Sequence, residues 1–575
     1  MIVSHEIAIC VHRCLPALRC ALAALALSAV SHAAVAQVIP GGALPGRERE
    51  QLLDRRPVPR AQPGGVAISL PSTEAPAGAT QTMLVIRSIR ITGSTVYSDE
   101  QFAELYRDLL NRQVTLQAVY DLAKRITAKY GADGYVLSRA IVPPQELSPG
   151  GANLRVQVVE GWVSKVIWPR EKLARYRDFF TEYAAKIVAQ RPANVRTLER
   201  YLLLANDLPG LKFTTTLEAS KSEPGASTLI VEVTEKRVDV IARFDNRGTQ
   251  ARGPYQYLIA PTINNVFGSH EAFTLAYAGV TQFEELQFVA PSYRHVLTSE
   301  GLTAFVNGSY SWGRPGTEVL RALGFKTRST TVEAGLFTPI VRARERNLTL
   351  TGLVFISDNY SFVDLTGPET FQVDRLRGGR VRADADMADS LGGINQISVT
   401  VSQGLQGLGS TDNANPLASR IAGKVDFTKI DGFVSRLQPL FGRFSALVAA
   451  YGQYAGTSLL VPEQCGYGGR VFGRAYDPCE LLGDHCWGVS AELRFDIPGA
   501  KLPVPDAQLY VFADKGRVYT IEPAVGTADS VAGASAGGGV RLRWQNYFHV
   551  DLSAAKAIEG PRDDWRFFFI TTARY

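Results

Sequence analysis

The segment that decides the fold is the last one, residues 564–575, which read DWRFFFITTARY. Taken in steps of two, one face of this segment has no charge and carries three aromatic side chains, Phe567, Phe569 and Tyr575. The other face carries Arg566 and Arg574. This alternation is typical of a strand with one face in lipid and the other in a polar barrel lumen. A buried final strand of a soluble β-sandwich would give a similar pattern, so that alternative stays open at this point.

Composition favours the membrane barrel. Charged residues make up 20% and hydrophobic residues 46% of the 575, both ordinary values. No apolar run after residue 36 is long enough to cross a bilayer as a helix. A membrane protein without such helices must be a closed barrel, because only helices and barrels satisfy every backbone group in lipid. The formal charge of +6 is small for this length and argues against nucleic-acid binding.

The first 36 residues have the features of a secretory signal peptide. Arg13 and Arg19 supply positive charge, an apolar stretch runs over 20–30, and Ala34-Val35-Ala36 matches the small-x-small cleavage pattern. A membrane anchor is the alternative, but the apolar stretch is too short to span a bilayer. We expect the mature chain to begin near Gln37.

Residues 37–82 are rich in Pro, Gly and Ala. Within them, residues 46–56 (GREREQLLDRR) predict a short charged helix that Pro57 stops, and residues 57–82 predict a flexible linker. A disordered tail is the alternative.

Two small α+β modules follow, over residues 83–161 and 162–236. In the first, a strand (84–91) precedes helices over 98–110 and after Thr115, and strands over 135–142 and 153–159 close the module. The second repeats this order, with a helix from about Glu171 and another over 195–205. Tandem copies of one small module favour a binding arm over a catalytic domain.

From residue 237 to residue 575 the helical pattern disappears and short alternating segments follow one another. Leu509, Val511 and Ala513, for example, alternate with Tyr510, Phe512 and Asp514. A sandwich would give similar local patterns, but no second domain is visible that could cover so much apolar surface. With roughly 20 residues for each strand and its connection, this region accommodates about 16 antiparallel transmembrane strands.

Three cysteines remain after the signal peptide: Cys465, Cys479 and Cys486. An oxidising compartment then allows one disulfide and one free thiol. Cys479 and Cys486 are nearest in sequence and form the candidate disulfide, although sequence alone does not assign the connectivity. Zinc is a weak alternative, because His485 fits no standard zinc spacing, and we expect no metal and no cofactor.

Several motifs together resemble one family. The stretch 465–498 is the most distinctive part of the chain, and shorter matches are Pro143-Pro144-Gln145, residues 206–210 (NDLPG) and residues 245–248 (DNRG). With the Pro-rich start and the two modules, the chain resembles the outer-membrane transporters of two-partner secretion (TpsB; ShlB/FhaC/HecB family) in the Omp85 superfamily. The resemblance implies that both modules are POTRA domains, over 83–161 and 162–236.

The resemblance also implies a mechanism-bearing loop that folds into the barrel lumen. Its tip motif corresponds to Arg474-Ala475-Tyr476, and the arginine's partner on the barrel wall to Asp514 of Phe512-Ala513-Asp514. The alternation above places Asp514 on the lumen face. Ala475 stands where the family has glycine, so a positive φ there would impose strain of about 1 kcal/mol.

What the resemblance implies about function is a pore for one large secreted exoprotein of the TpsA-like, hemolysin or adhesin type. The POTRA domains would recognise the unfolded exoprotein in the periplasm, and the helix over 46–56 would plug the lumen at rest. The barrel would contact outer-membrane lipid, and Phe567, Phe569 and Tyr575 would form the C-terminal signal for the barrel-assembly machinery.

Three other classes of protein share some of these features. An insertase of the same superfamily shares the arginine loop and POTRA domains, but carries more modules and usually no plug-like helix. A passive porin would not need periplasmic modules. An enzyme is not expected, because the mature chain's histidines, His270, His295, His485 and His549, have no recognisable catalytic spacing, and Gly466, Gly468 and Gly469 precede no helix that would make them a phosphate loop.

Overall fold

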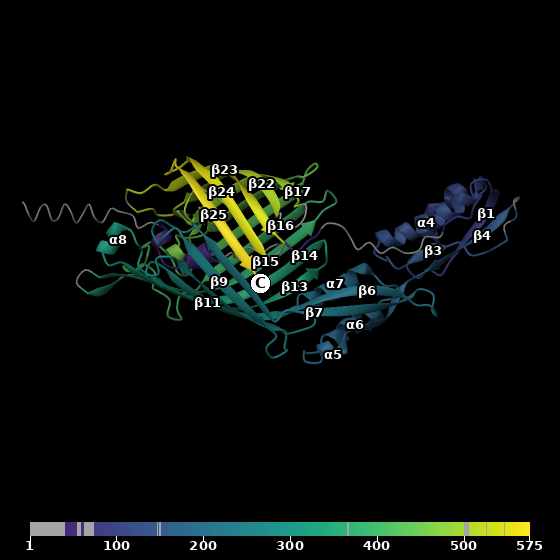
Figure 1. Cartoon of the computed structure of the whole chain (residues 1–575), viewed down its shortest axis with the longest axis horizontal. Coiled ribbons are helices and arrows are strands. Elements are labelled where there is room, and N and C mark those ends of the chain that lie inside the picture. Colours follow the sequence, from purple (N-terminus) through teal and green to yellow (C-terminus); the bar gives the residue numbers. More distant parts are fainter. Residues whose placement is uncertain are drawn as a thin grey trace, which may run out of the picture.

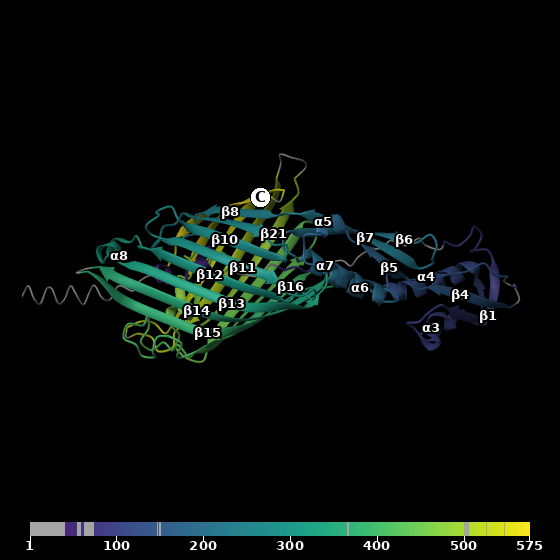
Figure 2. The ribbon, with the colours of Figure 1, turned by 90° about the horizontal axis from the view of Figure 1, so that it is seen from below.

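The computed structural model describes residues 41–53, 59–62, 74–146, 148, 151–364, 367–499, 505–524, 526–545 and 547–575. The predicted signal peptide, residues 1–36, lies outside these ranges. A β-barrel forms one end of the molecule, and two small modules extend from it in a line (Figures 1 and 2). None of the described helices is both long and apolar enough to cross a membrane.

The first module comprises β1 (Met83–Thr92), α3 (Asp99–Tyr106), η2 (Arg107–Leu109), β2 (Gln113–Thr115), α4 (Leu116–Ala132), β3 (Arg139–Ile141) and β4 (Ala152–Val159). Its sheet has the order β2-β1-β4-β3. The predicted second helix is confirmed, because the Thr115 hydroxyl caps α4 by accepting from the amide of Ala118 at 3.3 Å. The short strand β2 was not predicted, because its three residues show no alternation.

The second module comprises β5 (Trp162–Ile167), α5 (Arg170–Leu173), α6 (Phe180–Ala189), α7 (Val195–Asn206), β6 (Leu211–Ala219) and β7 (Ala226–Glu235), in the sheet order β5-β7-β6. The single helix predicted from about Glu171 is wrong, since α5 and α6 are separate. Asp178 explains the break, because its carboxylate accepts from the amide and hydroxyl of Thr181 and so starts a new helix. Trp168 and Phe180 are buried in the core of this module.

The barrel has 16 strands in a closed antiparallel order, which confirms the predicted fold class of a transmembrane barrel of about 16 strands. The strands are β8 (Val238–Asp245), β9 (Gln256–Asn264), β10 (Glu271–Val280), β11 (Gln287–Val296), β12 (Thr303–Gly313), β13 (Lys326–Arg342), β14 (Arg346–Asp364), β15 (Pro368–Ala388), β16 (Ile394–Gly404), β17 (Thr428–Pro439), β18 (Phe444–Ala455), β21 (His485–Ile497), β22 (Asp506–Tyr519), β23 (Ser530–Trp544), β24 (Phe548–Glu559) and β25 (Trp565–Arg574). The short helix α8 (Glu318–Ala322) lies in the connection between β12 and β13, at the end remote from the modules (Figure 1).

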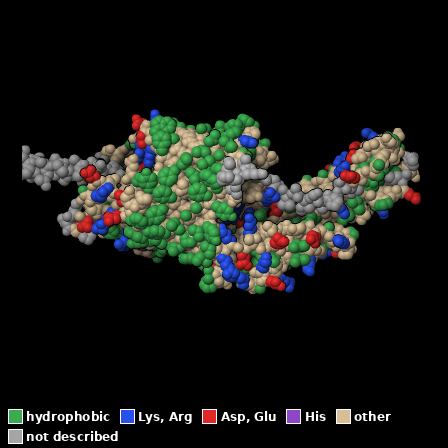
Figure 3. All heavy atoms as spheres, in the orientation of Figure 1, with side chains coloured by type: hydrophobic (Ala, Val, Ile, Leu, Met, Phe, Trp, Pro, Cys, Tyr) green, Lys and Arg blue, Asp and Glu red, His purple; other side chains and the backbone are tan. Residues whose placement is uncertain are grey.

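The alternation read from the sequence separates an outer from an inner face. On β22, Leu509 and Val511 are 46% and 58% exposed, whereas Tyr510 and Phe512 between them are each 6% exposed. Such exposed apolar residues recur around the barrel and form the broad green band in Figure 3. An apolar belt of this kind is the surface that a barrel presents to lipid.

The last strand closes the barrel against the first. β25 and β8 pair over five residues, from Ile570↔Asp245 to Arg574↔Ile241. The side chain of Asn246 prolongs this seam, because its amide donates to the carbonyl of Phe567 at 2.9 Å and accepts from the amide of Phe569 at 2.8 Å. The strand therefore makes the closing contact of the whole fold.

The aromatic residues on the uncharged face of the final segment lie on the outer side, whereas Phe568 of β25 is buried. Phe567 is 73% and Tyr575 is 76% exposed, and the ring of Phe569 lies 5.6 Å from that of Phe244 on β8. The uncharged face predicted from the sequence is therefore the outward face.

The second module is fixed to the turns at the near end of the barrel. Arg200 and Tyr201 of α7 bond the carboxylate of Glu300, in the β11–β12 turn, at 2.8 and 2.9 Å. Arg342 of β13 holds both oxygens of Asp207, at the end of α7, at 2.7 and 2.9 Å. Partial burial raises the pKa of Glu300, but the bonds from Arg200 and Tyr201 outweigh burial, so its pKa lies below the usual value.

The lowered pKa of Glu300 predicts a pH-dependent junction. The ionised carboxylate stabilises docking above its unfolded value of 4.5, and this contribution is lost as pH falls through the lower folded value. For a partly exposed pair we expect Glu300→Gln to cost about 0.5–1 kcal/mol at pH 7, seen as about 2–5-fold faster hydrogen exchange of the β11–β12 turn. In acid, the hydrogen-exchange rates of the wild-type and Glu300→Gln proteins should converge.

The matched control is Glu559→Gln, which removes an exposed ion pair with Lys515 at the far end of the barrel. It should leave exchange at the junction unchanged. A Glu300→Gln protein that exchanges like wild type at pH 7 would contradict the assignment.

Candidate functional site: a lumen closed from within

The connection between β18 and β21, residues 456–484, folds into the barrel, and we call it the inward loop. It contains η3 (Val461–Glu463) and a small hairpin of β19 (Cys465–Tyr467) and β20 (Leu481–Gly483). Its residues Tyr467, Ala475 and Tyr476 are 0%, 0% and 1% exposed. A loop standing in water would not bury such residues, so the lumen encloses its tip.

Arg474 lies at the tip of the inward loop and contacts the barrel wall. Its guanidinium bonds Glu492 of β21 at 2.5 Å and the hydroxyl of Ser490 at 2.9 Å. It lies 3.6 Å from the carboxylate of Asp514 and 4.0 Å above the ring of Phe512. The structure thus brings Arg474, Phe512 and Asp514 together, with Glu492 as the nearer carboxylate.

The carboxylate of Asp514 mainly accepts hydrogen bonds from the inward loop and from the barrel wall beside it. One of its oxygens accepts from the amide of Gly473 at 2.8 Å, from the hydroxyl of Tyr467 at 3.0 Å and from that of Ser535 at 2.6 Å. The wall residue expected to pair with the arginine therefore fixes the turn that presents the arginine.

Glu492 was missed by the sequence reasoning. It bonds Arg474 of the inward loop at 2.5 Å. It also bonds two arginines of the barrel wall, Arg494 and Arg541, each at 2.7 Å. A signal was present, because alternation along β21 places this carboxylate on the lumen face, but many lumen carboxylates share that signal.

Ala475 is not strained by its side chain. The residue with positive φ in this turn is Gly473, at +66°, where an added Cβ would lie 2.7 Å from the ring of Tyr467. Ala475 does not have a positive φ, and its carbonyl accepts from Arg566 at 3.1 Å. The hydroxyl of Tyr476 bonds the carbonyl of Glu559. The tip therefore tolerates alanine where the family has glycine.

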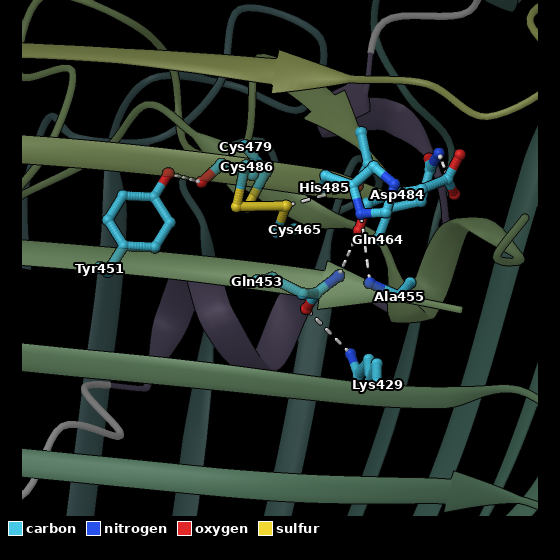
Figure 4. Close-up of a disulfide and its surroundings, with 12 residues drawn as sticks. Lys429, Tyr451, Gln453, Ala455, Gln464, Cys465, Cys479, Asp484, His485 and Cys486 are labelled. Carbon is cyan, nitrogen blue, oxygen red and sulfur yellow. Dashed lines mark hydrogen bonds between the residues drawn. A yellow bond between two sulfur atoms is a disulfide. The ribbon is translucent and has the colours of Figure 1, made fainter. Parts of the chain in front are cut away.

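The candidate disulfide between Cys479 and Cys486 is wrong. Cys465 pairs with Cys486, while Cys479 is a buried free cysteine (Figure 4). Proximity in sequence misled, because Cys465 lies in the β19–β20 hairpin, which folds back beside β21. The disulfide ties the start of the hairpin to the wall, and Cys479 contacts Arg47 and Glu50 of the N-terminal segment.

The N-terminal segment lies inside the barrel. It contains η1 (Gly41–Ala43) and α2 (Glu48–Leu52). Only α2 lies within the predicted helix range of 46–56, and residues 54–56 of that range lie outside the described residues. We call residues 41–53 the plug. Its charges meet partners from several elements: Glu48 pairs with Arg252 at 3.2 Å, Arg49 pairs with Glu333 at 3.1 Å, and Arg47 bonds the carbonyl of Gln464 at 2.5 Å.

An apolar contact also anchors the plug. Leu52 is 0% exposed and packs against a lumen-facing set on and beside β9, β10 and β11, which we call the leucine socket: Leu258, Ala276, Ala278, Val280, Leu286, Phe288 and Ala290. Burial of one leucine contributes about 2 kcal/mol, so this contact rivals the ion pairs in holding the plug.

Comparison with known proteins identifies the family. The description "Haemolysin secretion/activation protein ShlB/FhaC/HecB" matches residues 225–540, and "POTRA domain, ShlB-type" matches residues 84–161. Among curated relatives, the outer membrane transporter CdiB of Dickeya dadantii is 23% identical over 80% of each chain. The heme/hemopexin transporter protein HuxB of Haemophilus influenzae is 20% identical over 80% of this chain and 81% of its own.

Solved structures agree on the fold. CdiB from Escherichia coli matches with a TM-score of 0.67 and 19% identity, covering 94% of this chain and all of the other. CdiB from Acinetobacter baumannii matches with a TM-score of 0.56 and 19% identity, covering 86% and 90%.

The barrel, the POTRA match at residues 84–161 and a lumen that holds the protein's own segments define an outer-membrane transporter whose POTRA region lies in the periplasm. The chain belongs to the haemolysin secretion/activation family, ShlB/FhaC/HecB. It is a two-partner secretion transporter, and the insertase alternative is less supported.

The wall contacts of Arg474 predict unequal roles for the two carboxylates. Glu492→Gln removes the nearer of the two counter-charges of buried Arg474 and should weaken docking of the inward loop by about 3 kcal/mol. Asp514→Asn should cost less, because an amide oxygen still accepts from Gly473. Protease sensitivity of residues 468–480 measures both, and greater loosening by Asp514→Asn would contradict the ranking. The matched control is Asp506→Asn, which breaks the exposed pair with Arg543.

The leucine socket predicts how the plug is released. Leu52→Glu places a charge in an apolar site, which is strongly unfavourable, so the plug should leave the lumen. We expect a higher single-channel conductance in planar bilayers with the barrel still folded. Leu408→Glu is the control, because Leu408 is 83% exposed on a loop outside the lumen. Equal conductance of the Leu52→Glu and wild-type proteins would show that other contacts hold the plug.

Proposed function

We propose that residues 83–161 and 162–236 are two POTRA modules that capture a large unfolded exoprotein in the periplasm and deliver it to the barrel. The observation that carries this proposal is the lumen that holds two of the protein's own segments. A passive porin needs an open channel, whereas this barrel holds the plug and the inward loop inside it. A barrel whose lumen holds its own segments suits a transported protein whose arrival displaces one of them.

The plug is the part that leaves. It is joined to the first module through residues 54–82, and residues 59–62 lie at the near mouth of the barrel. There the backbone amides of Arg60 and Ala61 both donate to Asp386 at the end of β15, and Arg60 lies 3.5 Å from Asp207 of the second module. The exoprotein replaces the plug as the segment that crosses the lumen, and Arg474 keeps the inward loop docked while it passes.

The transporter acts by conduction and carries no catalytic step or cofactor. Folding of the exoprotein outside the cell supplies the driving force, because the periplasm lacks ATP. During biogenesis Phe567, Phe569 and Tyr575 form the signal read by the barrel-assembly machinery, and the apolar belt then faces outer-membrane lipid.

Secretion of a large exoprotein, where one is encoded in a neighbouring reading frame, tests this function. Deleting the transporter should remove that exoprotein from the medium, and the wild-type gene should restore it. In the complemented strain, Arg474→Ala should lower secretion about tenfold or more with the barrel still inserted. Arg543→Ala, at an exposed pair, is the control and should secrete normally.

Two outcomes would overturn the proposal. Unchanged secretion after deletion would show that the exoprotein uses another route. Unchanged secretion together with loss of other outer-membrane barrels would mean that the chain is an insertase.

A further inference from the structure

The outward face of β13 carries an arginine near the end of the barrel that is remote from the modules. Val332 and Leu336 are 42% and 47% exposed and belong to the apolar belt, whereas Thr327 and Ser329 are 3% and 6% exposed and face the lumen. Steps of two from Val332 toward the start of the strand place Arg328, which is exposed, on the outward face. A guanidinium on the lipid-facing surface of a barrel is costly at the middle of the membrane and tolerated only near its surfaces.

A second outward arginine lies two strands away, on β15. Asp374 and Leu376 are 3% and 0% exposed and face the lumen, so Arg375 between them faces outward, where it is exposed. Its Nε donates to the hydroxyl of Tyr360 on β14 at 3.1 Å, and Tyr360 is the register partner of Arg328. The two arginines therefore flank one tyrosine on the outer surface. We call Arg328 and Arg375 the outward arginines.

Aromatic rings show the depth at which the outward arginines lie. Trp312 of β12 is the register partner of Arg328 and is 39% exposed. Phe362 stacks on Tyr360 with ring centroids 6.1 Å apart, and its ring centroid lies 6.0 Å from the guanidinium carbon of Arg328. Outward aromatic residues of a barrel lie at the level of the lipid headgroups. Because the modules mark the periplasmic end, the outward arginines lie at the headgroup level of the outer leaflet.

Carboxylates on the same strands do not neutralise the outward arginines. Asp358 of β14 pairs with Arg377 at 2.7 Å, and Asp364 of β14 pairs with Lys326 at 2.8 Å. Within the part of the chain that the structure describes, no carboxylate forms an ion pair with either outward arginine. Two positive charges at the lipid boundary are therefore left for an anion that the membrane supplies.

The strands that carry this site are long enough to reach beyond the hydrocarbon. β13, β14 and β15 contain 17, 19 and 21 residues. About 9–11 residues of a tilted strand suffice to cross the hydrocarbon of a bilayer. The surplus length forms a wall at the headgroup level, against which a large headgroup can lie.

We propose that the outward arginines bind the phosphates of a phosphorylated glycolipid of the outer leaflet. The lipid has the chemistry of lipid A, which is a disaccharide with a phosphate on each sugar ring and several acyl chains. A guanidinium suits this ligand because its planar fork of N–H donors matches the oxygens of a phosphate. The acyl chains lie on the apolar belt, which continues below the outward arginines.

The spacing of the outward arginines favours a headgroup with two phosphates. They lie on β13 and β15, which β14 separates, so their backbones are about 10 Å apart. A disaccharide with a phosphate on each ring offers one phosphate to each arginine. A phospholipid with a single phosphate would leave one arginine without a counter-charge.

The test compares lipids that differ only in their phosphates. The full-length transporter in detergent is mixed with diphosphoryl lipid A or with dephosphorylated lipid A, and native mass spectrometry measures the bound fraction. We expect the wild-type protein to bind the diphosphoryl form about tenfold more tightly than the dephosphorylated form. Arg328→Gln combined with Arg375→Gln should abolish this preference, and each single change should remove part of it.

Two further variants separate the proposed contact from a general effect of charge. Arg436 of β17 shares the outward face with Ile430 and Val434, but it lies at the periplasmic end and pairs with Asp389 at 2.6 Å. Arg436→Gln is therefore the matched control and should bind lipid A as the wild type does. Arg328→Lys should bind with intermediate affinity, because lysine keeps the charge but lacks the planar fork.

A second measurement leaves both arginines in place. A photoreactive amino acid at Trp312 should cross-link diphosphoryl lipid A that is added at one molecule for each transporter. The same group at Ile430, which is 46% exposed on the outward face of β17 near the same end of the barrel, should give much less cross-linking. This comparison decides the question even if the double variant fails to fold.

Contrary results are clear. A wild-type protein that binds both forms of lipid A equally, or a folded double variant that keeps the preference for phosphate, overturns the inference. Equal cross-linking from Trp312 and Ile430 also overturns it, because the apolar belt alone would then hold the lipid. Complete displacement of lipid A by millimolar inorganic phosphate would show a site for free anions rather than for a lipid.

Discussion

The hydrogen-bond ladder between β25 and β8 is the constraint on which the rest of the structure depends. In hydrocarbon an unpaired backbone group costs several kcal/mol, so a sheet can cross a membrane only if its two edges meet. Here they meet over five residue pairs, and Asn246 supplies a side-chain amide where the backbone pairing ends. Once the ladder closes, every strand has a lipid face and a lumen face, and the lumen becomes a compartment that the chain can fill.

Filling that compartment creates a second constraint, because charges removed from water need partners. The barrel wall satisfies this constraint with carboxylates that each pair with more than one arginine. Glu333 bonds Arg49 of the plug and lies 3.5 Å from Arg380 of the wall. If the plug leaves as proposed, Glu333 therefore keeps a counter-charge. Arg252 differs, since its side-chain partners in the described residues, Glu48 and the carbonyls of Ala43 and Leu44, all lie on the plug. Loss of these contacts would oppose the proposed departure of the plug, so they favour the plug inside the lumen.

The sequence predicted those features that repeat along the chain. The period-two alternation on β22 identified which residues face lipid, and the helical spacing after Thr115 identified α4. It could not rank carboxylates within the lumen, because Glu492 and Asp514 both lie on inward positions and only the path of the inward loop decides which of them reaches Arg474. The cysteine pairing failed for the same reason. Cys479 is nearer to Cys486 in sequence, but the β19–β20 hairpin brings Cys465 back to β21.

The strands differ in how their outward backbone groups are hydrogen-bonded, and this difference follows their place in the molecule. In the barrel the closed ladder leaves no strand edge, and in the first module the side chains of Thr127 and Gln145 complete the β3 edge, which Pro143 and Pro144 cut short. Both arrangements resist pairing with other chains. If the transported protein is unfolded, as proposed, unpaired backbone groups elsewhere on the transporter would pair with it and slow its passage. The backbone groups of the closed barrel and of the β3 edge are thus paired within the chain.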